Sequence, residues 1–147
     1  MAFRVLQIIN RNNLGGLLLI ACNMAQGLQN KYDIKVISGI RNEDEGDAQH
    51  LIDNYEISFQ LIKTMRRSIL PWQDIKSYFE IKKIIKDFRP HIVHTHAAKA
   101  GALGRLAASH AGVPIIIHLF HGHVFHNFFN PLLSKIFVFI EKYLIIV

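Results

Sequence analysis

Cysteine is nearly absent from this chain of 147 residues, and no secretion signal is visible. Cys22 is the only cysteine, and it falls in an apolar, helix-like stretch. A disulfide framework is therefore excluded, and a reducing compartment is expected. The N-terminus lacks the basic region, apolar core and small-residue cleavage site of a signal peptide. We accordingly expect a cytoplasmic protein in which Cys22 packs in the core.

Long hydrophobic runs are also missing. The two most apolar stretches, 14–25 and 136–147, are shorter than the roughly 20 residues that span a bilayer, and polar side chains interrupt both. A membrane-spanning helix is not expected, whereas peripheral contact with the inner face of the membrane fits this composition. Hydrophobic residues make up 50% of the chain and charged residues 19%, which favours a single globular domain over 1–147.

Negative charge is scarce, and the formal net charge is +6. Such a balance predicts an anionic partner, which could be nucleic acid, a phosphorylated substrate or a membrane leaflet. The basic residues are spread along the chain instead of forming a tail, and this disfavours nucleic acid. No Asp or Glu occurs between Asp87 and Glu141, while eight of the nine histidines lie within 91–126. Hydrogen bonding in that region therefore falls to imidazoles, which suits anionic or hydroxyl-rich ligands.

Apolar runs and helical periods alternate along the chain. We predict strands at 3–9, 34–37, 57–62, 91–95 and 115–118, and helices at 17–28, 51–52, 74–88, 100–111 and 131–143. Asp74 is the expected N-cap of the third helix, and 64–73 is expected to be an exposed loop. Repeated strand and helix units predict an α/β fold with a doubly wound parallel sheet.

Histidines follow each other at the end of the fourth predicted strand. His94 and His96 are two residues apart, so their side chains leave one face of the strand toward the crevice above the sheet. Lys99 follows on the loop, and Gly101 and Gly104 permit a close backbone approach. A sugar hydroxyl or a phosphate would fit there. The alternative is that these imidazoles only close the strand by bonding to neighbouring backbone.

A second histidine pair follows the fifth predicted strand. Gly122 lies between His121 and His123 and lets the turn bring both imidazoles to the same edge of the sheet. A structural turn packed by aromatic side chains is the alternative. The spacing of the histidine pairs would also suit zinc, although no carboxylate or cysteine lies nearby to complete a mixed ligand set.

A glycine pair separates the first predicted strand from the first helix. Gly15 and Gly16 would leave backbone amides and the positive end of the helix dipole open to a phosphate. No third glycine follows in the first turn, and no acidic residue ends the second strand to hold a ribose. A nicotinamide-binding domain is therefore a poor fit.

The ordered motifs in 89–107 and 112–125, with the glycine pair, resemble the N-terminal, acceptor-side domain of bacterial family-4-type glycosyltransferases. The resemblance covers essentially the whole chain and implies a Rossmann-like sheet that forms one half of a GT-B fold. It also implies transfer of a sugar from a nucleotide-sugar donor to a saccharide or lipid-linked acceptor in cell-surface polysaccharide synthesis. Neither a metal nor another cofactor is implied.

The resemblance also implies roles for individual residues. Gly15 and Gly16 would approach the donor phosphate, and His121 would contact the donor sugar as the catalytic residue. The cleft would be lined by four further residues: His94, His96, Lys99 and His123.

The donor-binding domain of such enzymes has no counterpart in this sequence. We therefore expect that the isolated chain is inactive, and that it is either truncated or completed by a separate donor-binding chain. The alternative is a non-catalytic remnant or subunit that binds a partner.

Overall fold

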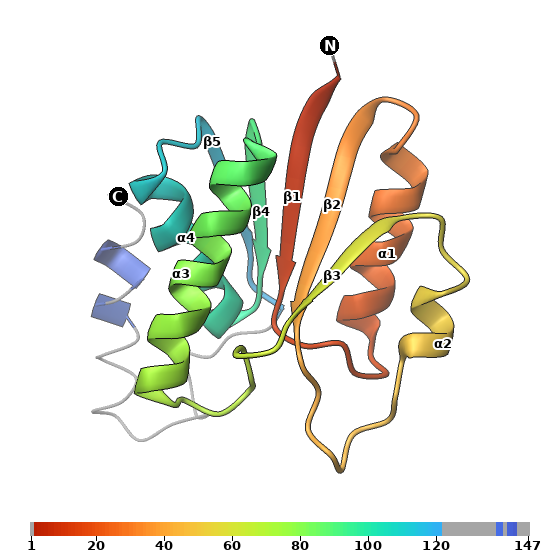
Figure 1. Cartoon of the computed structure of the whole chain (residues 1–147), viewed down its shortest axis with the longest axis horizontal. Coiled ribbons are helices and arrows are strands. Elements are labelled where there is room, and N and C mark those ends of the chain that lie inside the picture. The colour runs from red at the N-terminus through yellow and green to blue at the C-terminus, as the bar shows by residue number, and fades with distance from the viewer. Residues whose placement is uncertain (1, 122–137, 140, 144–147) are drawn as a thin grey trace.

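The computed structural model describes residues 2–121, 138, 139 and 141–143. Its centre is a five-stranded sheet in the order β3-β2-β1-β4-β5, in which every neighbouring pair is parallel (Figure 1). The strands are β1 (Phe3–Ile9), β2 (Tyr32–Gly39), β3 (Ser58–Ile62), β4 (Ile92–His96) and β5 (Ile115–Leu119).

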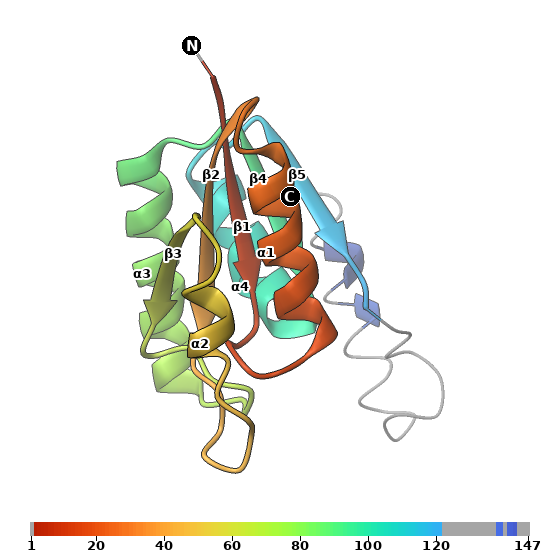
Figure 2. The ribbon, with the colours of Figure 1, turned by 90° about the vertical axis from the view of Figure 1, so that its right-hand side faces the viewer.

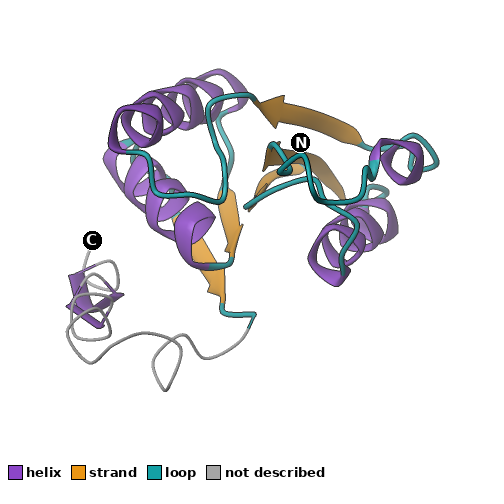
Figure 3. Ribbon diagram, turned by 90° about the horizontal axis from the view of Figure 1, so that it is seen from below, coloured by secondary structure: helices purple, strands orange, loops and turns teal. Residues whose placement is uncertain are grey.

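Helices cover both faces of this sheet. They are α1 (Gly16–Leu28), α2 (Gln49–Ile52), α3 (Pro71–Phe88) and α4 (Ala98–His110). Helices α1 and α2 lie on one face and α3 and α4 on the other (Figures 2 and 3). The predicted doubly wound parallel α/β fold is confirmed. Because the winding reverses between β1 and β4, the crevice at their carboxyl ends is the expected ligand position.

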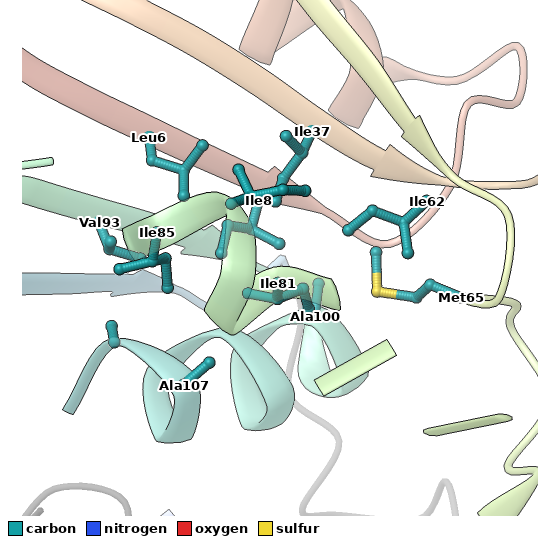
Figure 4. Packing of buried hydrophobic residues seen from close by; sticks show 12 residues of the cluster. Leu6, Ile8, Ile37, Ile62, Met65, Ile81, Ile85, Val93, Ala100 and Ala107 are labelled. Atoms are coloured by element: carbon teal, nitrogen blue, oxygen red, sulfur yellow. The ribbon is translucent and has the colours of Figure 1, made fainter. Parts of the chain in front are cut away.

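The core follows from the alternation of side chains along the strands. Leu6 and Ile8 of β1 are fully buried against α3 and α4 (Figure 4), whereas Ile9 packs with the α1 side. Burial of each such side chain stabilises the fold by about 1.5–3 kcal/mol. Two apolar clusters on opposite faces thus hold the central strands rigidly.

Helix α4 approaches the sheet closely because it carries two glycines. A Cβ atom on Gly104 would lie 2.7 Å from Cγ2 of Thr95 and 2.9 Å from Cδ1 of Ile8. A Cβ atom on Gly101 would overlap the ring of His118. Gly101 and Gly104 therefore allow α4 to approach the sheet closely, whereas the sequence suggested that they allow a ligand to approach.

The start of α3 differs from the prediction. Its N-cap is Leu70 and Pro71 is the first helical residue, so the prediction of Asp74 as N-cap was wrong. Proline suits this position because its fixed φ is helical and its missing N–H needs no partner. Asp74 lies in the first turn, where Oδ2 accepts a hydrogen bond of 3.0 Å from the Leu70 amide. The preceding segment is partly anchored, since Met65 is completely buried.

The predicted helix 131–143 falls only in part within the described residues. Positions 138, 139 and 141–143 are helical, and the remainder lies outside them. Glu141 accepts two hydrogen bonds, of 2.8 and 2.7 Å, from Nη2 of Arg105, a side chain that is buried on α4. The positive charge of Arg105, which lies in the stretch without Asp or Glu, is thus neutralised within the protein. Within the described part of the chain, no helix is both long and apolar enough to cross a bilayer.

Candidate functional site

Three imidazoles meet at the carboxyl edge of the sheet. His94 and His96 project from the same face of β4, as predicted, with ring centroids 4.1 Å apart. His121 follows β5, and its Nε2 lies 2.9 Å from Nδ1 of His96. His96 is completely buried while His121 is exposed, so the group extends from the sheet to the surface. The structure therefore brings together three of the four predicted histidines, and His123 lies outside the described residues.

Two of these imidazoles, His94 and His96, have pKa values below the usual value of histidine. Burial, followed by the nearby rings of His94 and His121, lowers the pKa of His96 to about 3. Burial and then His121 also lower the pKa of His94 below its usual value. His94 and His96 consequently provide hydrogen-bonding groups and ring surfaces in place of the positive charge that the composition suggested.

The opposite face of β4 holds a different pair. Oγ1 of Thr95 lies 2.9 Å from Nδ1 of His118, beneath helix α4. Burial, reinforced by the charge of Arg105, lowers the pKa of His118 to about 4. Alternation along β5 separates this side chain from the three imidazoles, so His118 belongs to the packing of α4.

The turn from β4 to α4 is strained. Ala97 has φ 64° and ψ 164°, a conformation that favours glycine and costs a side-chain-bearing residue about 1–3 kcal/mol. Its amide donates to the carbonyl of Leu119 at 3.2 Å, which ties the end of β4 to the end of β5. The turn therefore fixes the backbone immediately after His96.

Lys99 is placed differently from the expectation. It lies in the first turn of α4, not on a loop. Its ammonium pairs with the carboxylate of Asp74 and donates to the carbonyl of Ser68 at 2.5 Å. The side chain therefore joins the start of α4 to the start of α3, and its charge is directed away from the imidazoles.

The glycine pair lies at the start of α1, where Gly15 precedes the helix and Gly16 is its first residue. Gly15 is the N-cap, with φ −170° and ψ 160°, an extended conformation open to any residue. A Cβ atom on Gly16 would meet nothing within 4 Å. Neither glycine is therefore required by the backbone, and the first amides of α1 have no partner within the helix, which is the feature by which helix N-termini bind anions. The loop itself is fixed, because Oδ1 of Asn12 accepts a bond of 2.9 Å from the amide of Arg41.

Two polar side chains with unpaired buried oxygens, on β1 and directly after it, were not predicted. Gln7 is 1% exposed on β1, in register with His94, and Asn10 follows the same strand. Within the described residues, Oε1 of Gln7, Oδ1 of Asn10 and Nε2 of His96 are buried without hydrogen-bond partners. Each such atom costs about 1–3 kcal/mol unless something pairs with it. A glutamine inside the apolar run of β1 was the available signal in the sequence.

Among the described residues, no group of three side chains is placed to hold a metal ion, and His123 and His126 lie outside them.

An open parallel sheet with polar side chains gathered at the carboxyl ends of its central strands defines a Rossmann-like domain, and ligands of such folds bind at that edge. The chain belongs to the glycosyl transferase 4-like family, whose model matches residues 10–145. It is thus glycosyltransferase-like, with the fold of one half of a GT-B enzyme.

Curated relatives agree with this family. The chain is 35% identical over 97 residues to the UDP-Gal:alpha-D-GlcNAc-diphosphoundecaprenol alpha-1,3-galactosyltransferase of Escherichia coli. The alignment covers 66% of this chain and 24% of the relative. It is 32% identical over 72 residues to the UDP-N-acetylglucosamine–N-acetylmuramyl-(pentapeptide) pyrophosphoryl-undecaprenol N-acetylglucosamine transferase of Shewanella halifaxensis. That alignment covers 49% of this chain and 19% of the relative. The matched part is therefore a quarter of these relatives' length or less.

Solved structures share the fold. MurG of Acinetobacter baumannii superposes with a TM-score of 0.57 at 19% identity, covering 79% of this chain and 35% of that one. A putative UDP-N-acetylglucosamine 2-epimerase of Listeria monocytogenes gives 0.69 at 14% identity, covering 98% and 38%. At these identities the likeness concerns the fold alone.

Proposed function

We propose that this chain is the acceptor-side domain of a transferase that moves a sugar from a nucleotide-sugar donor to a saccharide or lipid-linked acceptor for a cell-surface polysaccharide. The observation that carries the proposal is the group of His94, His96 and His121 at the carboxyl edge of the sheet, where the fold places a ligand. The E. coli and Shewanella relatives are named for undecaprenol-linked acceptors and UDP-linked donors, which supports this class of substrates.

The proposed roles follow the geometry. His121 is exposed at the edge and contacts the donor sugar. Gly15 and Gly16 leave the first amides of α1 open for the donor phosphate. His94 and His96 form the wall of the cleft, to which His123 is also assigned. Lys99 supports this wall by holding α4 against α3.

Catalysis in this proposal requires a donor-binding domain beyond these 147 residues, in the same polypeptide or in a separate chain. The test is to assay nucleotide-sugar turnover with the chain alone and with a donor-binding domain of the family added. Transfer is expected only in the second case. His121→Ala should lower its kcat about 100-fold, a loss typical of one transition-state hydrogen bond.

His110→Ala provides the matched control, because His110 lies at the far end of α4 and bonds to Tyr78. Robust turnover by the chain alone, or full activity of His121→Ala in the reconstituted pair, would contradict the proposal. Stable association without turnover would instead favour the alternative of a non-catalytic, partner-binding subunit. The exposed apolar row of Ile115, Ile117 and Leu119 on β5 fits that alternative.

The proposed location is the cytoplasm, at the inner face of the membrane. Five large apolar side chains are exposed at the start of α3 and along its first half, and we call them the apolar patch: Ile69, Leu70, Trp72, Ile75 and Phe79, exposed by 73, 37, 80, 49 and 61%. Phe79 also lines an apolar groove of about 450 Å³ between α3 and α4. Arg66 and Arg67 lie on the same segment, and the lysines of α3 follow. Apolar side chains beside basic ones suit an anionic leaflet.

Co-sedimentation with vesicles tests this location. Anionic vesicles should bind the chain more tightly than neutral ones, because each basic residue near the surface contributes about 1 kcal/mol. Charge reversal at Lys82, Lys83 and Lys86 should remove this preference, and Trp72→Ser should weaken binding to both kinds of vesicle. Binding that neither change alters would exclude this surface from membrane contact.

A further inference from the structure

The contact between His96 and His121 joins a buried ring to an exposed one. Nδ1 of His96 and Nε2 of His121 are 2.9 Å apart, and the two rings stack with an interplanar angle of 29°. The contact uses one nitrogen of each ring. Its proton must come from one of the two residues, and which residue supplies it decides what His121 can offer to a ligand.

The surroundings of His96 select the donor. His96 is 0% exposed and burial keeps it neutral, so it carries one N–H. If His121 donated, the proton of His96 would lie on Nε2, where the described residues provide no acceptor. If His96 donates from Nδ1, then Nε2 is only an unpaired acceptor. Buried N–H groups without acceptors are rarer in proteins than under-used acceptors.

We propose that His96 is a positioning residue that donates from Nδ1 to Nε2 of His121 and thereby holds His121 in the tautomer with its proton on Nδ1. His121 then presents an N–H donor to the cleft. Its partner is an oxygen with lone pairs, such as a hydroxyl or phosphate oxygen of the ligand. The identification of this oxygen with the donor sugar rests on the proposed function. In this tautomer His121 donates a hydrogen bond to the ligand and does not act as the base that deprotonates the acceptor.

Nitrogen NMR tests the tautomer directly. Long-range ¹H–¹⁵N correlation spectra of the ¹⁵N-labelled chain at pH 7.5 distinguish protonated from unprotonated ring nitrogens, and loss of signals in His121→Gln assigns the residue. We expect a protonated Nδ1 and an unprotonated Nε2 for His121. A spectrum of wild-type chain with the proton of His121 on Nε2 would overturn the proposal, whatever any variant shows.

Two variants at the same position separate positioning from packing. His96→Leu removes the donor, and His121 should shift toward the Nε2–H tautomer that unrestrained histidine prefers in water. His96→Asn places an amide N–H near the former Nδ1 and should restore the wild-type tautomer. His110→Leu, at the far end of α4, should leave the signals of His121 unchanged. An unchanged His121 tautomer in a folded His96→Leu chain would contradict the assignment.

The experiment needs neither donor nor acceptor, so it can fail independently of the proposed function. If the tautomer is as expected but His121→Ala does not affect transfer by the reconstituted enzyme, the proposed role of His121 is wrong and that of His96 stands. If transfer depends on His121 but its proton lies on Nε2, the role of His96 is wrong and the transferase proposal stands.

Discussion

The two faces of strand β4 are built from alternate residues of one short segment, yet they serve different purposes. Toward α4, Thr95 bonds to His118 under a helix whose glycines bring it into contact with the sheet. On the opposite face, Nε2 of His96 and Oε1 of Gln7 on the adjacent strand have no hydrogen-bond partner among the described residues, as is also true of Nε2 of His118. We call these the closed face and the open face. In the function proposed above, one face of the strand contributes to packing and the other contacts the ligand, because the side chains alternate.

Low pH should decrease the free energy of unfolding through histidines on both faces, and this is the largest effect on stability that we expect. Folding lowers the pKa of His96 to about 3 and that of His118 to about 4, from 6.5. The unfolded chain therefore binds more protons below pH 6.5, and stability falls as the pH decreases toward the folded values. At pH 5 the fully buried His96 should lower the free energy of unfolding by about 2 kcal/mol and the half-buried His118 by somewhat less, which makes between about 3 and 4 kcal/mol together.

Urea unfolding between pH 5 and pH 7.5 measures this loss, and single variants divide it between the faces. His118→Gln should remove the part that belongs to the closed face, and His96→Asn the part that belongs to the open face. A stability that does not change between pH 7 and pH 5 would show that neither imidazole is held neutral by burial.

Gly101→Ala tests the closed face by itself. The new methyl group would overlap the ring of His118, which Thr95 holds in place. The free energy of unfolding should decrease by about 3 kcal/mol, at the upper end of the costs of overpacking a core. Gly27→Ala on α1 is the matched control, because a Cβ atom there meets nothing within 4 Å. The control should gain about 0.5–1 kcal/mol from helix propensity, and equal stability of the two variants would contradict the tight contact.

The sequence predicted the fold and part of the open face for physical reasons. Apolar runs separated by helical periods indicated the five parallel strands, and the spacing of two residues placed His94 and His96 on one face. Both signals are local. The proximity of His121 to His96 also followed, because neighbouring parallel strands end at the same edge of the sheet.

Contacts between distant residues could not be predicted in this way. Lys99 pairs with Asp74, twenty-five positions earlier, only because α3 and α4 start side by side. Similarly, Arg105 is paired with Glu141 through packing that no sequence period reveals. The roles of single residues in the open face depend on such packing. The sequence therefore only proposes these roles, and the variants described here test them.

Gly16→Ala probes the start of α1 and should have the smallest effect on stability. Gly16 is the first residue of α1, has no neighbour where a Cβ would lie, and is exposed, so alanine should change the free energy of unfolding by less than about 0.5 kcal/mol. If the donor phosphate binds at the start of α1, the same methyl group obstructs it. In the reconstituted enzyme the KM for the nucleotide sugar should then rise about tenfold, which corresponds to about 1.4 kcal/mol. Gly27→Ala, near the other end of the helix, should leave KM unchanged. An unaltered KM in Gly16→Ala would place the phosphate elsewhere. A stability loss comparable to that of Gly101→Ala would mean that Gly16 is also tightly packed, and that the starts of α1 and α4 do not differ as the structure indicates.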